Sequence, residues 1–194
     1  MKKYELTGEV KVKFGVTFKR IRALIDFGNV KKGELGGFIE KEENLSHENN
    51  AWVYDDAEVS GNARVYDDAW VYGNAWVYGD ARVYGDAWVY GNAGVSGNAW
   101  VYGDARVSAD ARVSGNAEVS GNADYVLIGR VGSRFGFTTF FRNKNNEIYV
   151  SCGCFLGTLA KFRKKVKETH GTDTKYAKVY QAAADLAEMQ ILNK

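Results

Sequence analysis

The chain has 194 residues, of which 45% are hydrophobic and 26% are charged, proportions that are ordinary for a folded protein and exclude an intrinsically disordered chain. It contains no proline and no apolar run long enough to span a bilayer, so we expect no Pro-rich linker and no membrane insertion. The basic N-terminus is not followed by an apolar segment of the kind found in signal peptides, which predicts a cytoplasmic protein.

The net charge is only +2, but it is distributed unevenly. Residues 1–50 include ten basic and eight acidic residues, residues 51–122 four and ten, and residues 123–194 twelve and six. An acidic central segment is therefore followed by a basic C-terminal segment. This asymmetry indicates a charged partner, or contact between the two segments in different copies of the chain.

Residues 1–43 are predicted to form a β-rich N-terminal cap. Residues 4–6, 10–14 and 16–25 are rich in β-branched and aromatic side chains, and glycines interrupt them. Several lysines and arginines lie among these residues, and a basic strand face with aromatic neighbours is one way to contact nucleic acid. Solubilising charge on an exposed sheet face is the favoured interpretation.

Residues 51–122 consist of twelve six-residue units without insertion, with the pattern Ala-x-Val-[Tyr/Ser]-[Gly/Asp/Ala]-[Asn/Asp]. Ala and Val lie two positions apart, so they share one face of a strand, and the residues next to them face the other way. The last two positions hold residues that turn the chain. Each unit is thus predicted to be one short strand and one corner, with Ala and Val inside. Ile39 and Leu45 continue the phase of the Ala position backwards and predict two degenerate first units.

This unit resembles the hexapeptide repeat of left-handed β-helix proteins, in which three units form one triangular coil. The resemblance implies a mainly β chain: a left-handed parallel β-helix of about four regular coils over residues 44–122, between the N-terminal cap and a C-terminal α+β head (residues 123–194). Left-handed crossovers depart from the usual rule for parallel strands, so the handedness is implied by the resemblance alone. The whole chain also resembles small proteins of phages and prophages, with an opening like FKRIRALIDFGNVKKGELGGFIEKEENLS and a closing module like GSRFGFTTFF.

Coils of three units place residues 18 apart above one another, so the outward positions form columns. We predict that the columns of the first two faces bind a partner, because ordered exposed aromatic and arginine side chains are typical of interfaces; stacking among the side chains themselves is the alternative. The first face carries Trp52, Trp70 and Trp88 with Tyr54, Tyr72 and Tyr90, and the second carries Arg64, Arg82 and Trp100 with Tyr66, Tyr84 and Tyr102. The third face is irregular, with Glu58, Trp76, Gly94 and Arg112, and Tyr78 is its only tyrosine.

One corner column is acidic, because Asp68, Asp86 and Asp104 are 18 residues apart. Strand spacing would place their carboxylates about 4.8 Å from one another. Oxygen ligands in such a row are able to hold a hard cation such as calcium. The simpler interpretation is that Asp alternates with Asn as a turn residue, and we predict no metal and no cofactor.

Residues 123–194 leave the repeat and are predicted to form the head. Residues 125–128, 135–142 and 148–155 have strand character, and Thr158 is the predicted N-cap of a helix over residues 159–169, which a second helix follows at about 174–192. The basic residues of the first helix are Lys161, Arg163, Lys164, Lys165 and Lys167; a solvated face is favoured over contact with an anionic partner. Cys152 and Cys154 are too close for an unstrained bridge within one strand and are expected to be buried or half-buried thiols.

The best-known hexapeptide enzymes resemble this chain only in its repeats. The carbonic anhydrases among them need three histidine ligands, whereas this chain has two histidines, His47 and His170. The acyltransferases usually carry a catalytic histidine among the coils, and residues 51–122 contain none. We therefore expect a protein that is not an enzyme.

The resemblance to phage proteins implies a binding protein that acts in the cytoplasm of a bacterial host. Its expected partner is a host defence component, for example a CRISPR effector, and its aromatic faces are also expected to support homo-oligomers. Three alternatives remain open: a structural homo-oligomeric scaffold, a nucleic-acid or nucleotide-binding module, and an acyltransferase-like enzyme. Nucleic-acid binding is less favoured than protein binding.

Overall fold

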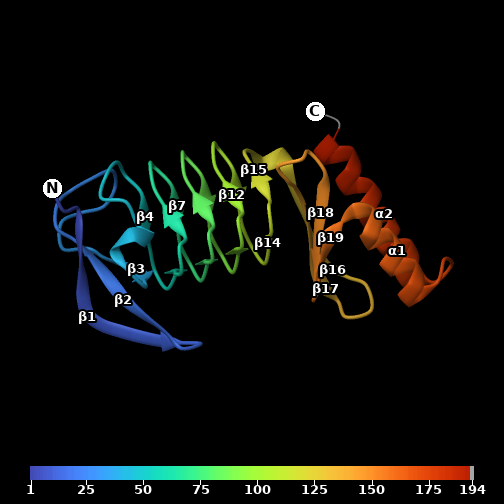
Figure 1. The fold of residues 1–194 in the computed structure, drawn as a ribbon, viewed down its shortest axis with the longest axis horizontal. Helices are drawn as coiled ribbons and strands as arrows, with labels where there is room; N and C mark the ends of the chain where they lie inside the picture. The colour runs from blue at the N-terminus through green and yellow to red at the C-terminus, as the bar shows by residue number, and fades with distance from the viewer. Residues whose placement is uncertain (193–194) are drawn as a thin grey trace.

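The six-residue units form the turns of a β-solenoid in the computed structural model, which describes residues 1–192. The molecule is elongated, with the N-terminal cap at one end and the C-terminal head at the other (Figure 1). Each unit supplies one two-residue strand. The strands are β4 (Trp52–Val53), β5 (Glu58–Val59), β6 (Arg64–Val65), β7 (Trp70–Val71), β8 (Trp76–Val77), β9 (Arg82–Val83), β10 (Trp88–Val89), β11 (Gly94–Val95), β12 (Trp100–Val101), β13 (Arg106–Val107), β14 (Arg112–Val113) and β15 (Glu118–Val119).

Strands three units apart pair in parallel, so the predicted columns are confirmed. Trp70 is in register with Trp88, Arg64 with Arg82 and Trp76 with Gly94. The first face is the sheet β4-β7-β10-β13, the second is β6-β9-β12-β15, and the third includes β5-β8-β11-β14. Because β3 (Leu35–Ile39) precedes β5 in the third sheet, the solenoid has about five turns rather than four.

The interior is filled by alanine and valine alone through all twelve units, each at most 2% exposed. The corners stack as closely as the strands do. At Gly97, φ is +66° and a Cβ atom would lie 2.9 Å from the backbone nitrogen of Gly115 in the next turn. Glycine is needed there because a larger residue would meet both backbone strain and the neighbouring corner. Where Asp55 takes this position, its carboxylate accepts a hydrogen bond from the Gly73 N–H in the next turn at 3.1 Å.

The predicted phase of the first two units is wrong by two residues. Ile39 pairs with Val59, and Leu45 with Val65, so both lie in the valine column instead of the alanine column. Eight residues separate Leu45 from Val53, where a regular unit would have six. The larger side chains suit the valine column, and the two extra residues lengthen the corner that leads into β4.

The cap continues the third sheet of the solenoid. β1 (Tyr4–Lys13) and β2 (Val16–Ala23) form an antiparallel hairpin, and β2 pairs with β3, which pairs in parallel with β5. The predicted strands are present, with residues 4–6 and 10–13 joined into one. A short 3-10 helix, η1 (Glu42–Asn44), follows β3. The hairpin tip diverges from the solenoid and lies below its first turns in Figure 1.

Trp52 is fully buried, which corrects the prediction that it faces solvent with the other tryptophans. The edges of Tyr4 and Phe27 contact it, with ring centroids 6.1 and 5.3 Å away. Lys3 is buried nearby and donates hydrogen bonds to three backbone carbonyls, the shortest of 2.8 Å to that of Ala51. Burial lowers the pKa of Lys3 to about 8. The cap folds over this side because the first turn of a solenoid has no preceding turn to cover it.

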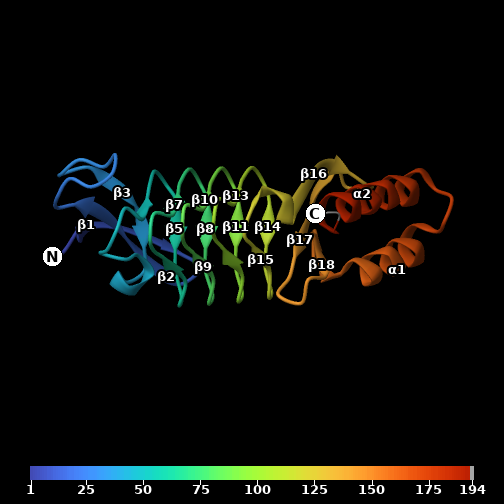
Figure 2. The ribbon, with the colours of Figure 1, turned by 90° about the horizontal axis from the view of Figure 1, so that it is seen from above.

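The head is a four-stranded antiparallel sheet with two helices on the side away from the solenoid (Figure 2). After the short 3-10 helix η2 (Asn122–Asp124) come β16 (Tyr125–Val131), β17 (Gly136–Arg142), β18 (Ile148–Cys152), β19 (Phe155–Thr158), α1 (Leu159–His170) and α2 (Lys175–Leu192). Adjacent residues of β17 face opposite ways: Phe141 packs into the solenoid core and Phe140 into the helix layer. Neither described helix is long and apolar enough to cross a membrane.

The head confirms the predicted α+β class and helix positions, with two corrections. The predicted strand over residues 148–155 is a hairpin, since Gly153 turns the chain at φ +58° between β18 and β19. Cys154 lies in that turn and is exposed, whereas Cys152 is half-buried as expected. Thr158 is the N-cap of α1, and its side chain accepts a hydrogen bond from the Lys161 backbone N–H.

Candidate binding surface

The aromatic side chains of the first face stack on one another. The rings of Trp70 and Trp88 are 5.6 Å apart with an interplanar angle of 9°, and those of Tyr72 and Tyr90 are 4.8 Å apart at 3°. The guanidinium of Arg106 lies 4.5 Å from the centre of Trp88. All four stacked rings are half-buried, and Tyr54 is too, so that burial raises its pKa to about 12. Ring stacking therefore uses much of the surface that was predicted to meet a partner.

The second face has the same construction. Tyr84 stacks on Tyr66 and Tyr102, with centroid distances of 4.9 and 5.0 Å. Burial raises the pKa of all three phenols. Arg82 lies over Trp100 at 5.2 Å, while Arg64 is exposed. This face presents ring edges and two arginines to the solvent.

On the third face, as at Trp100 of the second, the aromatic residues have no aromatic neighbour in their columns. Trp76 lies between Glu58 and Gly94, and Tyr78 occupies a column in which the adjoining turns carry serine. Trp76 is 37% exposed and Tyr78 47%. The ring that contacts Trp76 comes instead from Phe14 at the hairpin tip, edge to face at 6.4 Å. Phe14 is itself 87% exposed.

A cleft of about 340 Å³ lies between the hairpin tip and this face; we call it the hairpin cleft. It is formed by residues of β1, β2, β5 and β8 and the corners next to them, since the two strands of the hairpin lean away from the solenoid there. Its lining combines aromatic and aliphatic side chains with the polar groups of Lys13, Glu58 and Ser60. The lining residues are Lys13, Phe14, Val16, Phe18, Glu58, Ser60, Trp76, Val77 and Tyr78.

The charges at the hairpin cleft are unequal, with Lys13 and Glu58 in its lining and Lys11 beside it. Glu58 is 5% exposed, and its two carboxylate oxygens lie 2.5 Å from the Lys11 ammonium and 3.0 Å from that of Lys13. The Lys13 ammonium also lies 3.5 Å from the centre of the Trp76 ring, a cation–π contact. Two cations thus share one carboxylate, and this group of three side chains keeps a positive charge on an otherwise acidic solenoid.

The sequence prediction did not include this site. It named the regular columns and left out Phe14, Trp76 and Tyr78. The available signal was the interruption of the third column, where single aromatic residues stand among glutamate, glycine, arginine and serine. The contribution of Phe14 was not visible in the sequence, because only the fold brings the hairpin to this face.

In the acidic corner the structure favours the turn interpretation. Asp68 accepts hydrogen bonds from the backbone and side-chain N–H groups of Asn50, at 3.2 and 2.7 Å. Asp86 and Asp104 are exposed. Within residues 1–192 there is no group of three or more His, Cys, Asp or Glu side chains arranged to hold a metal ion.

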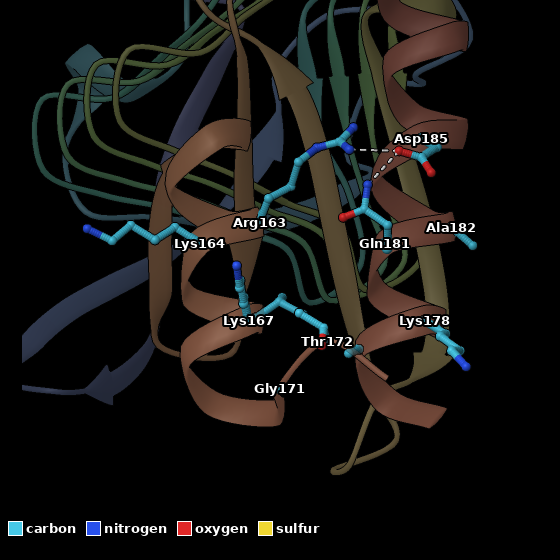
Figure 3. A pocket seen from close by; sticks show the side chains of 11 residues that line it. Arg163, Lys164, Lys167, Gly171, Thr172, Lys178, Gln181, Ala182 and Asp185 are labelled. Atoms are coloured by element: carbon cyan, nitrogen blue, oxygen red, sulfur yellow. Dashed lines mark hydrogen bonds and ion pairs between the residues drawn. The ribbon is translucent and has the colours of Figure 1, made fainter. Parts of the chain in front are cut away.

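A groove of about 600 Å³ lies between α1 and α2 on the head (Figure 3). Arg163 crosses from α1 to α2, where it pairs with Asp185 at 2.8 Å and with Glu188 at 2.6 Å. The other basic residues of α1 are exposed, namely Lys161, Lys164, Lys165 and Lys167. The arginine therefore joins the helices, and the lysines form a solvated basic face.

Neither His47 nor His170 lines the hairpin cleft. The His47 ring stacks on Tyr4 at 4.2 Å, and its Nδ1 atom accepts a hydrogen bond from the Lys3 backbone N–H at 3.2 Å. Burial lowers the pKa of His47. His170 is at the end of α1, with its ring 5.7 Å from that of Tyr180.

Comparison with known proteins finds similarity in the solenoid. Residues 57–73, 75–91 and 99–115 match the family model described as YdcK Beta solenoid repeat. The chain is also 34% identical over 68 residues to the "Uncharacterized acetyltransferase YdcK" of Escherichia coli (strain K12), a match that covers 31% of this chain and 21% of that relative. The chain thus spans about a fifth of the relative's length. The observed strands show that the twelve units form a β-solenoid, and the matched residues within 57–115 are similar to the YdcK repeat.

Proposed function

We propose that this protein is a non-catalytic binding protein that holds a partner protein at the hairpin cleft. One observation carries the proposal: Phe14, Trp76 and Tyr78 stay exposed around a cleft and lack the stacking that covers the other aromatic columns. Exposed aromatic side chains at the edge of a concave site are typical of binding hot spots. The stacked, half-buried columns of the first two faces stabilise the solenoid turns that carry the hairpin cleft.

The resemblance of the whole chain to phage proteins supports a more specific form of this proposal. In that form the partner is a bacterial defence component, such as a CRISPR effector, and binding blocks one of its working surfaces. A rigid solenoid suits this role, because a preorganised surface loses little conformational entropy when it binds. Self-association through the aromatic columns is a further proposal and is compatible with it.

The aromatic residues of the cleft are expected to be necessary for capture of the partner. We expect the amount of partner captured by the double variant with Phe14→Ser and Trp76→Ser to fall at least about tenfold below that of the unchanged protein. The reason is that truncation of a hot-spot residue costs about 2 kcal/mol or more of binding free energy. The measurement is affinity capture from a bacterial lysate with quantitative mass spectrometry. Trp100→Ser is the matched control, because Trp100 is 39% exposed on another face. Recovery of copies of the protein alone, or of the same proteins by every variant, would contradict the proposal.

Acetyl transfer is a second candidate, and the name of the YdcK relative, an uncharacterized acetyltransferase, favours it. Under the binding proposal, incubation with acetyl-CoA and a panel of amine and alcohol acceptors should release no free thiol above the protein-free rate. His47 does not line the hairpin cleft; its ring stacks on Tyr4 and accepts a hydrogen bond from the Lys3 backbone N–H. Thiol release that disappears with His47→Gln would favour the enzyme instead.

A further inference from the structure

We propose that the third face binds an extended, acidic segment of the partner in which an apolar or aromatic side chain stands between two carboxylates. This inference rests on the proposed function and specifies the chemistry of the partner. The apolar side chain enters the hairpin cleft beside Phe14 and Trp76. The carboxylates meet two cationic groups, one on each side of it.

The first cationic group is the lysine pair of the hairpin. Lys13, which lines the cleft, and Lys11, which lies outside the lining, share the single carboxylate of Glu58, so these three side chains together keep one net positive charge. Both ammonium groups are reachable from the solvent, with side chains 38% and 27% exposed. A carboxylate from a partner would complete the pairing and gain a charge-assisted hydrogen bond.

The second cationic group is Arg112, which lies two turns beyond Trp76 in the same sheet. Its side chain folds back over Gly94, where a Cβ atom would lie 3.2 Å from its Cδ. The guanidinium donates a hydrogen bond to the Asn92 carbonyl at 2.6 Å. Among residues 1–192 no acidic side chain forms an ion pair with it.

The spacing of these groups selects an extended segment. Neighbouring strands of a sheet are about 4.8 Å apart, so Glu58, which holds the lysine pair, and Arg112 are separated by roughly 14 Å across Trp76 and Gly94. An extended chain advances about 3.3 Å per residue and alternate side chains share one face, so carboxylates about four residues apart reach both ends, with the apolar side chain midway on the same face. Glu58, already paired twice, is the single acid of this outward column, and electrostatic complementarity therefore favours acidic over basic partners here.

The test is selection of a displayed library of random seven-residue peptides on the full chain. We run it on the unchanged protein, on Trp76→Ser and on Trp100→Ser. Peptides recovered by the first and third proteins but not by the second are expected to carry an aromatic or aliphatic residue flanked by Asp or Glu. All three proteins should give the same circular dichroism spectrum, because both tryptophans are partly exposed.

Synthetic copies of the recovered peptides then test the two cationic groups by calorimetry. Lys13→Gln and Arg112→Gln are each expected to weaken binding about tenfold, and added salt should weaken it further. Lys19→Gln is the control, since this exposed lysine of β2 does not line the cleft and its loss should change the affinity little.

The outcomes separate this inference from the proposed function. Neutral or basic peptides whose binding depends on Trp76 would overturn the acidic segment and leave the cleft as a protein-binding site. Equal affinity of the acidic peptides for the unchanged protein and both charge variants would overturn it as well. If no peptide depends on Trp76, the proposed function at this cleft fails together with the inference.

Discussion

Replacing Trp52 by alanine is expected to lower the free energy of unfolding by about 3–5 kcal/mol, the range for large aromatic residues in cores. Its indole is fully buried, with Tyr4 and Phe27 against it. Gly36 of β3 lies so close that a Cβ there would be 2.7 Å from the indole ring. Because the residues of the cap are packed around this ring, we expect the substitution to leave a cavity that the cap cannot fill. Urea unfolding followed by circular dichroism measures the loss.

Trp100→Ala is the control for that experiment. Trp100 occupies the same position of its repeat unit but is 39% exposed, so its loss is expected to cost about 1 kcal/mol or less. The contrast tests whether Trp52 belongs to the core or to a binding surface. Similar costs for the two substitutions, or loss of partner capture by a fully stable Trp52→Ala, would contradict the structural assignment.

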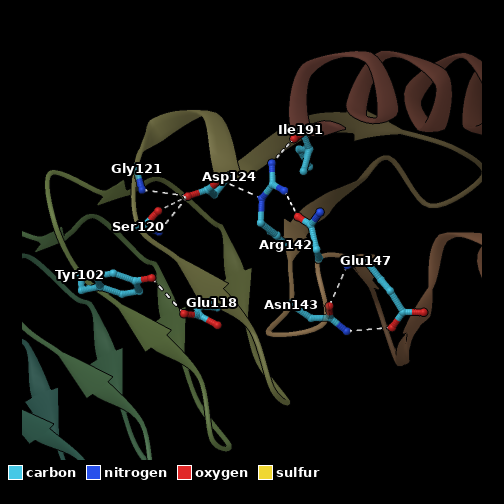
Figure 4. A network of polar contacts seen from close by, with 10 residues as sticks. Tyr102, Glu118, Ser120, Gly121, Asp124, Arg142, Asn143, Glu147 and Ile191 are labelled. Carbon is cyan, nitrogen blue, oxygen red and sulfur yellow. Dashed lines mark hydrogen bonds and ion pairs between the residues drawn. The ribbon is translucent and has the colours of Figure 1, made fainter. Parts of the chain in front are cut away.

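Replacing Asp124 by alanine is expected to cost about 3–5 kcal/mol, the range for breaking a buried ion pair. Figure 4 shows Asp124 between the last turn of the solenoid and the head. One of its oxygens accepts from the Arg142 Nε–H at 3.0 Å, and the other accepts from Ser120 and Gly121. Arg142 in turn donates to the Ile191 carbonyl at the end of α2. Loss of the carboxylate removes the centre of this network and leaves the partly buried Arg142 guanidinium without the acidic partner that it has in Asp124.

Hydrogen exchange of the backbone amides in α1, α2 and β17 measures the expected destabilisation of the head by Asp124→Ala. We expect faster exchange in the head and unchanged protection in β7 to β11, because solenoid turns contact mainly their neighbours. Glu147→Ala is the control: this exposed residue accepts one side-chain hydrogen bond, from Asn143, in the same region. Equal effects of the two substitutions would show that Asp124 does not join the head to the solenoid.

The candidate site was much less accessible to sequence reasoning than the fold. The columns of the first two faces followed from the period alone, but the period could not show that Trp70 and Trp88 cover one another or that Trp52 lies beneath the cap. It also gave no weight to Trp76, which has no like residue in its column. Exposure depends on which other segments cover a side chain, and Trp52 is covered by Tyr4 and Phe27, which lie 48 and 25 residues earlier in the chain.

The repeat by itself determined the solenoid, the inward alanine and valine, the outward columns and the turning corners. It could do so because each unit contacts mainly the units 18 residues away, so that local geometry and a fixed period specify every contact. Only the tertiary structure decided where the two ends of the solenoid are covered, how Ile39 and Leu45 enter the valine column, and that Phe14 meets Trp76. Those contacts join segments with no common period, and their free energy depends on side-chain shapes that meet only after the chain has folded.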